Sequence, residues 1–205
     1  ETANKYYKYN LKIQRLKGFC FFFLGDLENA NVIFDEILKK FPNDVEAIFG
    51  LAQLQAFEGR ISSAEKYYTQ ALTREASSKK ALLSLALISL KLGKYEQADN
   101  FINQAIYYHH NTPEVYYYAS YICVQKGDLS KAEEFIRTAV TLKPTYDKAN
   151  ALLAYILYCK GDYEEAVSIC DYRISQNRNN SDAWYLKSCA VYQLGSVEQS
   201  IKSLE

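Results

Sequence analysis

Residues 45–78, VEAIFGLAQLQAFEGRISSAEKYYTQALTREASS, contain the features that decide the fold. Gly59 divides this stretch into two segments, and apolar residues recur at intervals of three and four in both of them. Such spacing is typical of amphipathic α-helices and not of strands. Small residues, Ala52 and Ala64, lie in the two segments at points that face each other if the chain folds back at the glycine. Two helices approach closely only where neither backbone carries bulk, so the stretch predicts a tight helical hairpin.

The same arrangement recurs along the whole chain with a period of 34 residues. The period is marked by Gly25, Gly59, Gly93, Gly127, Gly161 and Gly195, and only Gly18 and Gly50 lie outside this series. A fixed period of about 20–50 residues indicates stacked supersecondary units. With each glycine numbered as position 15, the units are residues 11–44, 45–78, 79–112, 113–146, 147–180 and 181–205, the last of them truncated. Residues 1–10 either lengthen the first helix or belong to a preceding unit.

Two further columns and the prolines support this register. Position 8 holds Gly18, Ala52, Ala86, Ser120, Ala154 and Ser188, and position 20 holds Ala30, Ala64, Ala98, Ala132, Ala166 and Ser200. All of these residues are small, as close helix pairing requires. Pro42 and Pro144 lie at position 32, where a helix must already have ended, and Thr112 before Pro113 predicts a helix start. Each unit is therefore predicted to be helix, turn, helix.

This pattern resembles that of tetratricopeptide repeats, which have a large residue at position 4, Leu at 7, a small residue at 8, Gly at 15, Ala at 20 and 27, a large residue at 24 and Pro at 32. Six of these positions are matched in one unit by Leu51, Ala52, Gly59, Ala64, Tyr68 and Ala71, and Trp184 occupies position 4 of the last. The resemblance implies an all-α, right-handed superhelical solenoid formed by residues 11–205 as one non-enzymatic domain. The chain departs from the pattern at Asn150 (position 4), Arg173 (position 27), and Lys17 and Lys187 (position 7).

The first helix of each unit carries a second stripe at positions 2, 5, 9 and 12. In the repeats that this chain resembles, that stripe lines the concave wall that receives ligands. Tyrosine supplies a wide apolar contact area and a hydroxyl at little rotamer cost, which suits a recognition surface. The residues predicted to bind a partner are Phe22, Leu83, Leu87, Leu90, Tyr117, Tyr121, Tyr155, Tyr158, Tyr185 and Tyr192. The alternative is that part of this stripe is core between repeats.

Composition excludes several other classes of function. The 24 basic residues balance the 24 acidic ones, so nucleic acid is not an expected partner. The longest apolar runs are shorter than the roughly 18–20 residues that span a bilayer, so this part of the chain is not expected to insert into a membrane. The five cysteines lack metal-ligand spacing and are predicted to be buried thiols, which favours a reducing compartment such as the cytoplasm, although association of a longer protein with the cell envelope stays open.

Neither catalysis nor a cofactor is predicted. The adjacent His109 and His110 cannot share one helical face as a metal pair does, and no catalytic triad or phosphate-binding loop is present. The segment Lys5–Lys17 is basic and is either a solvated face or a docking patch. Methionine is absent, which suggests a piece of a longer protein.

Three functions are consistent with these sequence features. The leading hypothesis is a scaffold that binds a protein or peptide with apolar or aromatic anchors in the tyrosine-rich groove. The second is a regulatory or substrate-recruiting module of a larger enzyme or assembly. The third is self-association, as a homodimer through terminal repeats, or a structural solenoid whose groove is filled by a missing C-terminal segment.

Overall fold

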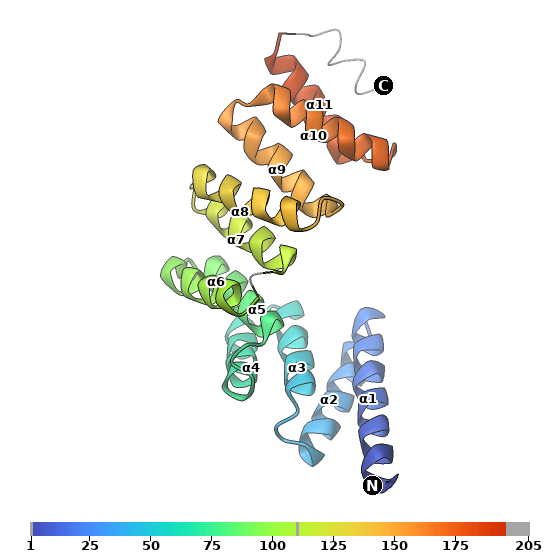
Figure 1. Cartoon of the computed structure of the whole chain (residues 1–205). Coiled ribbons are helices and arrows are strands. Elements are labelled where there is room, and N and C mark those ends of the chain that lie inside the picture. The colour runs from blue at the N-terminus through green and yellow to red at the C-terminus, as the bar shows by residue number, and fades with distance from the viewer. Residues whose placement is uncertain (1, 110, 196–205) are drawn as a thin grey trace. The chain divides into compact units, whose positions relative to one another are not determined.

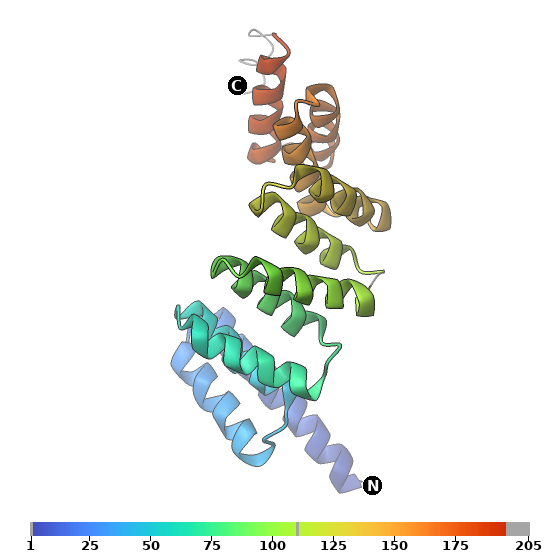
Figure 2. The ribbon, with the colours of Figure 1, turned by 90° about the vertical axis from the view of Figure 1, so that its left-hand side faces the viewer.

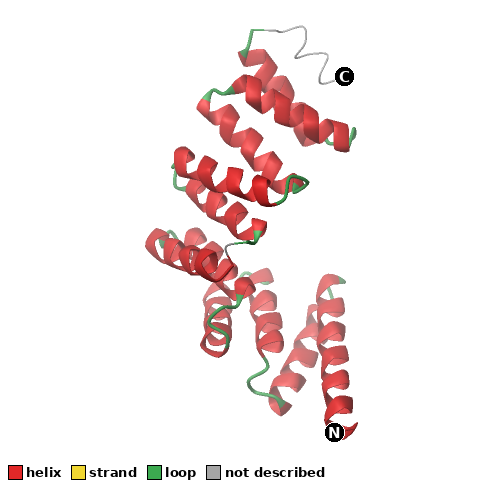
Figure 3. Cartoon of the chain, viewed as in Figure 1, coloured by secondary structure: helices red, strands yellow, loops and turns green. Residues whose placement is uncertain are grey.

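The computed structural model describes residues 2–109 and 111–195, and every regular element in these ranges is an α-helix (Figure 3). The first helices of the successive repeats are α1 (Thr2–Phe23), α3 (Val45–Phe57), α5 (Lys79–Lys91), α7 (Pro113–Gln125), α9 (Asp147–Lys160) and α11 (Ser181–Gln193). The second helices are α2 (Leu27–Lys40), α4 (Ile61–Arg74), α6 (Tyr95–His109), α8 (Leu129–Leu142) and α10 (Tyr163–Gln176). The all-α repeat fold predicted from the sequence is confirmed.

Helices α2, α4, α8 and α10 each pack on the first helix of their own repeat and on the first helix of the next repeat. Figures 1 and 2 show these antiparallel pairs from two sides, for example α7 with α8 and α9 with α10. Contacts of α2 with α3, α4 with α5, α8 with α9 and α10 with α11 join consecutive repeats. The contacts divide the chain into two compact units, residues 1–104 and 105–205, with the boundary inside α6. That residues 11–205 form a single domain stays a prediction.

The boundaries of the helices follow the punctuation of the sequence. All six glycines of the 34-residue series have positive φ, between 70° at Gly93 and 90° at Gly161. A Cβ at Gly161 would meet nothing within 4 Å, so this turn requires the conformational freedom of glycine rather than its small size. Helices α2 and α8 end before Pro42 and Pro144, as predicted. Helix α1 begins at Thr2, so residues 2–10 lengthen the first helix.

The two glycines outside the series, Gly18 in α1 and Gly50 in α3, make room for one aromatic ring. Phe34 of α2 is fully buried, and a Cβ at Gly50 or Gly18 would lie 2.4 Å or 2.8 Å from its ring carbons. Phe19 adds an edge-to-face contact with this ring, with the ring centroids 5.0 Å apart. Phe34 therefore connects the first two repeats through a contact that only glycine permits on both sides.

The equivalent junction between the second and third repeats has the same form with different residues. Tyr68 in α4 occupies the position of Phe34, is 4% exposed, and has a hydrogen bond with Ser84 in α5. Burial raises the pKa of Tyr68. Ser84 lies at the same repeat position as Gly50, so in both junctions a large ring at position 24 packs against a small residue at position 6.

In the five hairpins that the structure describes in full, the interior is closed by the small residues of positions 8 and 20. Ala64 and Ala132 have no exposed surface. In the hairpin of α7 and α8, the Ser120 hydroxyl, which is also buried, donates a hydrogen bond of 2.7 Å to the Ala132 carbonyl. The two helices are therefore so close that a side chain of one contacts the backbone of the other. A larger residue does not fit there.

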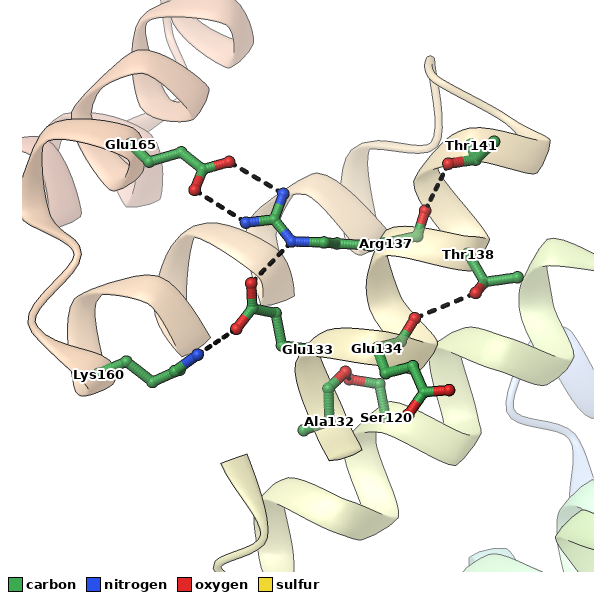
Figure 4. Close-up of polar contacts among 9 residues, drawn as sticks. All are labelled: Ser120, Ala132, Glu133, Glu134, Arg137, Thr138, Thr141, Lys160 and Glu165. Carbon is green, nitrogen blue, oxygen red and sulfur yellow. Dashed lines mark hydrogen bonds and ion pairs between the residues drawn. The ribbon is translucent and has the colours of Figure 1, made fainter. Parts of the chain in front are cut away.

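Charged side chains also connect consecutive repeats in the second compact unit. Figure 4 shows the Arg137 guanidinium of α8 between two carboxylates, with two bonds of 2.8 and 2.9 Å to Glu165 of α10 and one of 2.7 Å to Glu133. Glu133 also accepts from Lys160 at the end of α9. The hydrogen bonds from Lys160 and Arg137 lower the pKa of Glu133. This network stabilises the carboxylate form and joins the fourth repeat to the fifth.

We expect Glu133→Gln to lower the free energy of unfolding by about 0.5–1 kcal/mol at pH 7, because the network is partly in contact with water. The pKa of Glu133 is lower in the folded chain, so its contribution is complete above the unfolded pKa of about 4.3 and is lost as the pH falls through the folded pKa. Urea unfolding at pH 7, 5 and 3 measures this loss, with Glu134→Gln, an exposed neighbour, as control. A difference that is unchanged at pH 3 would contradict the assignment.

The two departures from the repeat pattern in the fifth repeat are polar residues that have partners. Arg173 in α10 is 5% exposed and donates two hydrogen bonds, of 2.8 and 3.2 Å, to the carboxylate of Asp147 at the start of α9. The bond to Arg173 lowers the pKa of Asp147. Asn150 is also buried and donates to the carbonyls of Pro144 and Tyr146. Both side chains therefore replace apolar residues of the pattern without leaving these donors unsatisfied.

Candidate functional site

The six predicted tyrosines lie on three neighbouring helices of the second compact unit. Helix α9 contacts both α7 and α11, so the first helices of the last three repeats are adjacent. The tyrosine face is defined as Tyr117 and Tyr121 on α7, Tyr155 and Tyr158 on α9, and Tyr185 and Tyr192 on α11. Positions 5, 9 and 12 of these three helices carry no ionisable residue other than tyrosine and cysteine, so the face has little charge at neutral pH.

Exposure divides the tyrosine face into two groups. Tyr185 is 66% exposed, Tyr192 is 58% exposed and Tyr155 is 47% exposed. Tyr117, Tyr121 and Tyr158 are half-buried. The free aromatic surface of the tyrosine face therefore lies mainly on α9 and α11.

Two of the half-buried tyrosines, Tyr117 and Tyr158, contribute to the core between repeats. Tyr117 lies against Tyr146, with ring centroids 5.7 Å apart, and Tyr158 lies against Tyr163 at 5.6 Å. Both Tyr117 and Tyr158 pack on the core cluster that contains Leu153 and Leu157. Burial raises the pKa of Tyr117, and it raises the pKa of Tyr146 to about 12. The alternative interpretation, that part of the stripe is core, therefore describes these residues.

Two of the exposed tyrosines have neutral hydroxyl groups that are already hydrogen-bonded to a cysteine. A hydrogen bond with Cys159 raises the pKa of Tyr155, and one with Cys189 raises the pKa of Tyr185. Both phenols are therefore protonated at neutral pH. The exposed group thus combines apolar ring surface with neutral hydroxyl oxygens that can accept hydrogen bonds, which is suited to the backbone N–H groups and apolar side chains of a peptide.

The other predicted residues belong to the first compact unit and are less exposed. Phe22 is half-buried and meets Phe57 edge to face, with ring centroids 5.8 Å apart. Leu83 is 8% exposed, so it packs in the protein's own core and offers little surface to a partner. Leu87 and Leu90 are half-buried.

The exposure of several cysteines and apolar side chains differs from the sequence prediction or was not predicted. Cys123 and Cys170 are buried, but the prediction of buried thiols is wrong for Cys20, which lies on an uncovered part of α1, and for Cys159, which lies beside a turn. Exposed apolar side chains at Phe23, Leu24, Phe57 and Tyr107 were not singled out. Their repeat positions lie outside the stripe that the sequence analysis considered.

The described ranges contain neither a cluster of metal ligands nor a helix that could span a membrane. No group of three or more His, Cys, Asp or Glu side chains there is arranged to hold a metal ion. His109 is the last residue of α6, and His110 lies outside the described residues. No helix among those described is both long and apolar enough to cross a membrane.

Family models match three parts of the sequence. Tetratricopeptide repeat models match residues 16–44 and 58–117. A model of the anaphase-promoting complex, cyclosome, subunit 3 matches residues 125–205. A comparison of the sequence with curated proteins gives no match.

Solved structures share the fold over most of the chain. PilF of Pseudomonas aeruginosa has a TM-score of 0.82 and 18% identity, covering 94% of this chain and 88% of the other. The Cut9–Hcn1 hetero-tetramer of APC/C has a TM-score of 0.77 and 16% identity, covering 93% of this chain and 38% of the other. YrrB, described as a TPR protein with an unusual peptide-binding site, has a TM-score of 0.64 and 18% identity, covering 83% and 88%.

The repeated hairpins, the small columns and the glycine turns define a helix-turn-helix repeat protein. The matching models narrow this class: the chain is a tandem array of tetratricopeptide repeats. Such repeats are protein–protein interaction modules, and proteins that contain them are generally non-enzymatic scaffolds.

Proposed function

We propose that the chain is a scaffold that binds a segment of a partner protein on the tyrosine face. The observation that carries this proposal is the exposure of Tyr155, Tyr185 and Tyr192 on two adjacent helices. Three large aromatic side chains left in water on neighbouring helices cost the protein apolar burial, and such patches mark interaction sites. Tyrosine is also among the residues that contribute most to binding energy at interfaces.

The chemistry of the face indicates the kind of segment it binds. Its rings supply apolar contact, and its neutral hydroxyl oxygens can accept hydrogen bonds from backbone N–H groups. Its lack of charge makes an anionic polymer an unsuitable ligand. A peptide or helix with apolar or aromatic anchors complements all three properties.

We expect the double variant Tyr155→Ser, Tyr185→Ser to weaken partner binding at least tenfold, which corresponds to about 1.4 kcal/mol. The probes are 12-residue peptides selected by display on the unaltered chain, titrated by fluorescence anisotropy at two salt concentrations. Salt is expected to change the affinity little, because the contacts are uncharged. Since both side chains are largely exposed, the melting temperature should change little.

A matched control is Tyr107→Ser on α6, where a tyrosine is 78% exposed outside the tyrosine face. The proposal fails if the selected peptides bind the double variant as tightly as the unaltered chain. It also fails if the double variant unfolds without a separable loss of binding, because these tyrosines would then be structural.

A second candidate function is that of a subunit in a large multi-protein assembly. The match of residues 125–205 to the anaphase-promoting complex subunit 3 model supports it, as does the similarity of the fold to the Cut9–Hcn1 structure. Purification of the tagged full-length protein from its own cells distinguishes the two. A subunit copurifies with the same set of proteins at constant ratios, whereas a peptide-binding scaffold exchanges its partners when a selected peptide is added.

A further inference from the structure

In the second and third repeats, a large side chain at position 4 closes the end of the hairpin that lies away from the glycine turn. Ile48, at position 4, shares a core cluster with Ala71, at position 27, and both are fully buried. Leu82 and Ala105, at the same positions of the third repeat, are also fully buried. A large apolar residue on the first helix thus fills the space beside a small residue on the second.

The fifth repeat has polar residues at both positions, and a cavity lies beside them. Asn150 replaces the large residue at position 4, and Arg173 replaces the alanine at position 27. The cavity has a volume of about 90 Å³ and is lined by Thr145, Asp147, Asn150, Tyr172, Arg173 and Gln176. A cavity of about 170 Å³ lies at the same end of the first repeat, where position 4 holds another amide, Gln14, and position 27 holds Ile37. In both repeats the loss of a large apolar residue at position 4 leaves space within the hairpin itself.

The charged groups of the fifth-repeat cavity neutralise each other. Arg173 is 5% exposed, and its Nε and Nη2 donate to the two carboxylate oxygens of Asp147 at 2.8 and 3.2 Å. The hydrogen bond from Arg173 lowers the pKa of Asp147, so the carboxylate is charged at neutral pH. An anionic ligand would lie close to this carboxylate, which opposes its binding. The cavity is therefore suited to an uncharged polar group.

One donor and one acceptor of the cavity have no partner among the described residues. The Asn150 Nδ2 donates to the carbonyls of Pro144 at 2.7 Å and Tyr146 at 3.3 Å, and this fixes the orientation of the amide. Its Oδ1 accepts no hydrogen bond there, and the Arg173 Nη1 donates none. Both side chains are 5% exposed, yet neither of these two atoms is completely enclosed by protein atoms. A molecule in the cavity can therefore accept from Arg173 and donate to Asn150.

We propose that the cavity of the fifth repeat binds a primary carboxamide group, either of a small free amide or of an Asn or Gln side chain on a partner protein. The carbonyl oxygen of this group accepts from Arg173 Nη1, and its NH₂ group donates to Asn150 Oδ1. A volume of about 90 Å³ equals that of about three liquid water molecules, which suits a group of this size. The site lies at positions 4 and 27, so it does not depend on the tyrosine face.

Three small molecules test the chemistry of the site. Propionamide both donates and accepts hydrogen bonds, propionate is an anion that only accepts, and N,N-dimethylacetamide is neutral but cannot donate. Each is titrated into the ¹⁵N-labelled full chain while the Arg173 Nε–H signal is followed by NMR. A ligand of so few atoms should bind in the millimolar range. We expect propionamide to bind at least tenfold more tightly than the other two. Propionate binding of equal strength, or no saturable shift with propionamide, would overturn the proposal.

Variants locate the binding site. Asn150→Leu supplies the residue that the third repeat has at this position, Leu82, and should abolish the response to propionamide. The matched change Gln14→Leu, at the equivalent place in the first repeat, should leave the Arg173 response unchanged. Arg173→Lys keeps the charge but removes the planar guanidinium. It should weaken binding at least tenfold, measured on the Asn150 side-chain signal, and this tests the site even if Asn150→Leu folds poorly. Unchanged affinity in Arg173→Lys, or in a folded Asn150→Leu, would overturn the proposal.

Two peptides distinguish the sources of the amide. Acetyl-Ala-Gln-Ala-N-methylamide carries one primary carboxamide, and its counterpart with Glu in place of Gln carries a carboxylate of the same shape. Binding of the Gln peptide more tightly than propionamide would identify a side chain of a partner protein as the ligand, and weaker binding would identify a free amide. A Glu peptide that binds as tightly as the Gln peptide would overturn the proposal.

Discussion

The variant Phe34→Ala is expected to lower the free energy of unfolding by about 3–5 kcal/mol, the cost of removing a buried phenylalanine and leaving a cavity. Gly18 and Gly50, which lie against the ring, have no side chains that could move into the cavity. Equilibrium unfolding in urea measures the change. Phe57→Ala, which removes a ring that is 69% exposed, should cost less than about 1 kcal/mol. Equal losses in the two variants would show that Phe34 does not connect the repeats.

The opposite change at the same junction provides a second measurement. Gly50→Ala places a methyl group where the Phe34 ring already lies, and overpacking of this kind costs about 1–3 kcal/mol. Because the two residues contact each other, Gly50→Ala combined with Phe34→Leu should cost less than the sum of the single changes. A strictly additive result would mean that the ring moves away without cost.

We expect Ala132→Leu to destabilise the chain by about 1–3 kcal/mol. Ala132 has no exposed surface, and its carbonyl accepts the Ser120 hydroxyl, so a leucine side chain must push α7 and α8 apart. The control Glu134→Leu adds the same side chain to the exposed side of α8 and should change stability by about 0.5 kcal/mol or less.

Hydrogen exchange should then show where the damage from Ala132→Leu lies. Each repeat contacts mainly its neighbours, so protection should fall in α7 and α8 before it falls in α1 and α2. Uniform loss of protection across the described helices would contradict this local response.

The helices and turns could be predicted from the sequence because their causes are local. A glycine every 34 residues marks each turn. Gly59 and Gly127 adopt positive φ, which glycine can do at little cost because it has no Cβ. The role of the small residues at positions 8 and 20 was predictable because paired helices leave no room for larger side chains where they cross. Ala64 and Ala132, which have no exposed surface, fit this expectation. None of these inferences requires a contact between distant repeats.

What could not be predicted depends on which side chains meet across repeats. Arg173 departs from the repeat pattern, and the sequence does not show that Asp147 lies opposite it. Likewise Arg137 and Glu165 are 28 residues apart and meet only because α8 and α10 are neighbours. Periodicity identifies the face on which a residue lies, but not the partner on the other side.

The same limit applies to the tyrosine face. Tyr117 and Tyr185 both occupy position 5 and are indistinguishable by periodicity. Tyr117 has Tyr146 beside it and is half-buried, whereas Tyr185 is 66% exposed. The location of the face was therefore predictable in outline, and the division between core and free surface was not.

The ring contacts at the first two junctions have a consequence for the order of the repeats. Phe34 meets Gly50 and Tyr68 meets Ser84, whereas the smaller Ile136 shares its core cluster with Leu152, a larger residue at the same repeat position as Gly50 and Ser84. A large residue at position 24 is thus paired with a small residue at position 6 of the next repeat, and a smaller residue at position 24 with a larger one at position 6. A shuffled array that placed the third repeat's α5 after α8 would leave a void beside Ile136, and one that placed α9 after α2 would drive Leu152 into Phe34. The repeats share a common backbone fold, but the order in which they follow one another is fixed by the matched sizes of the side chains at positions 24 and 6.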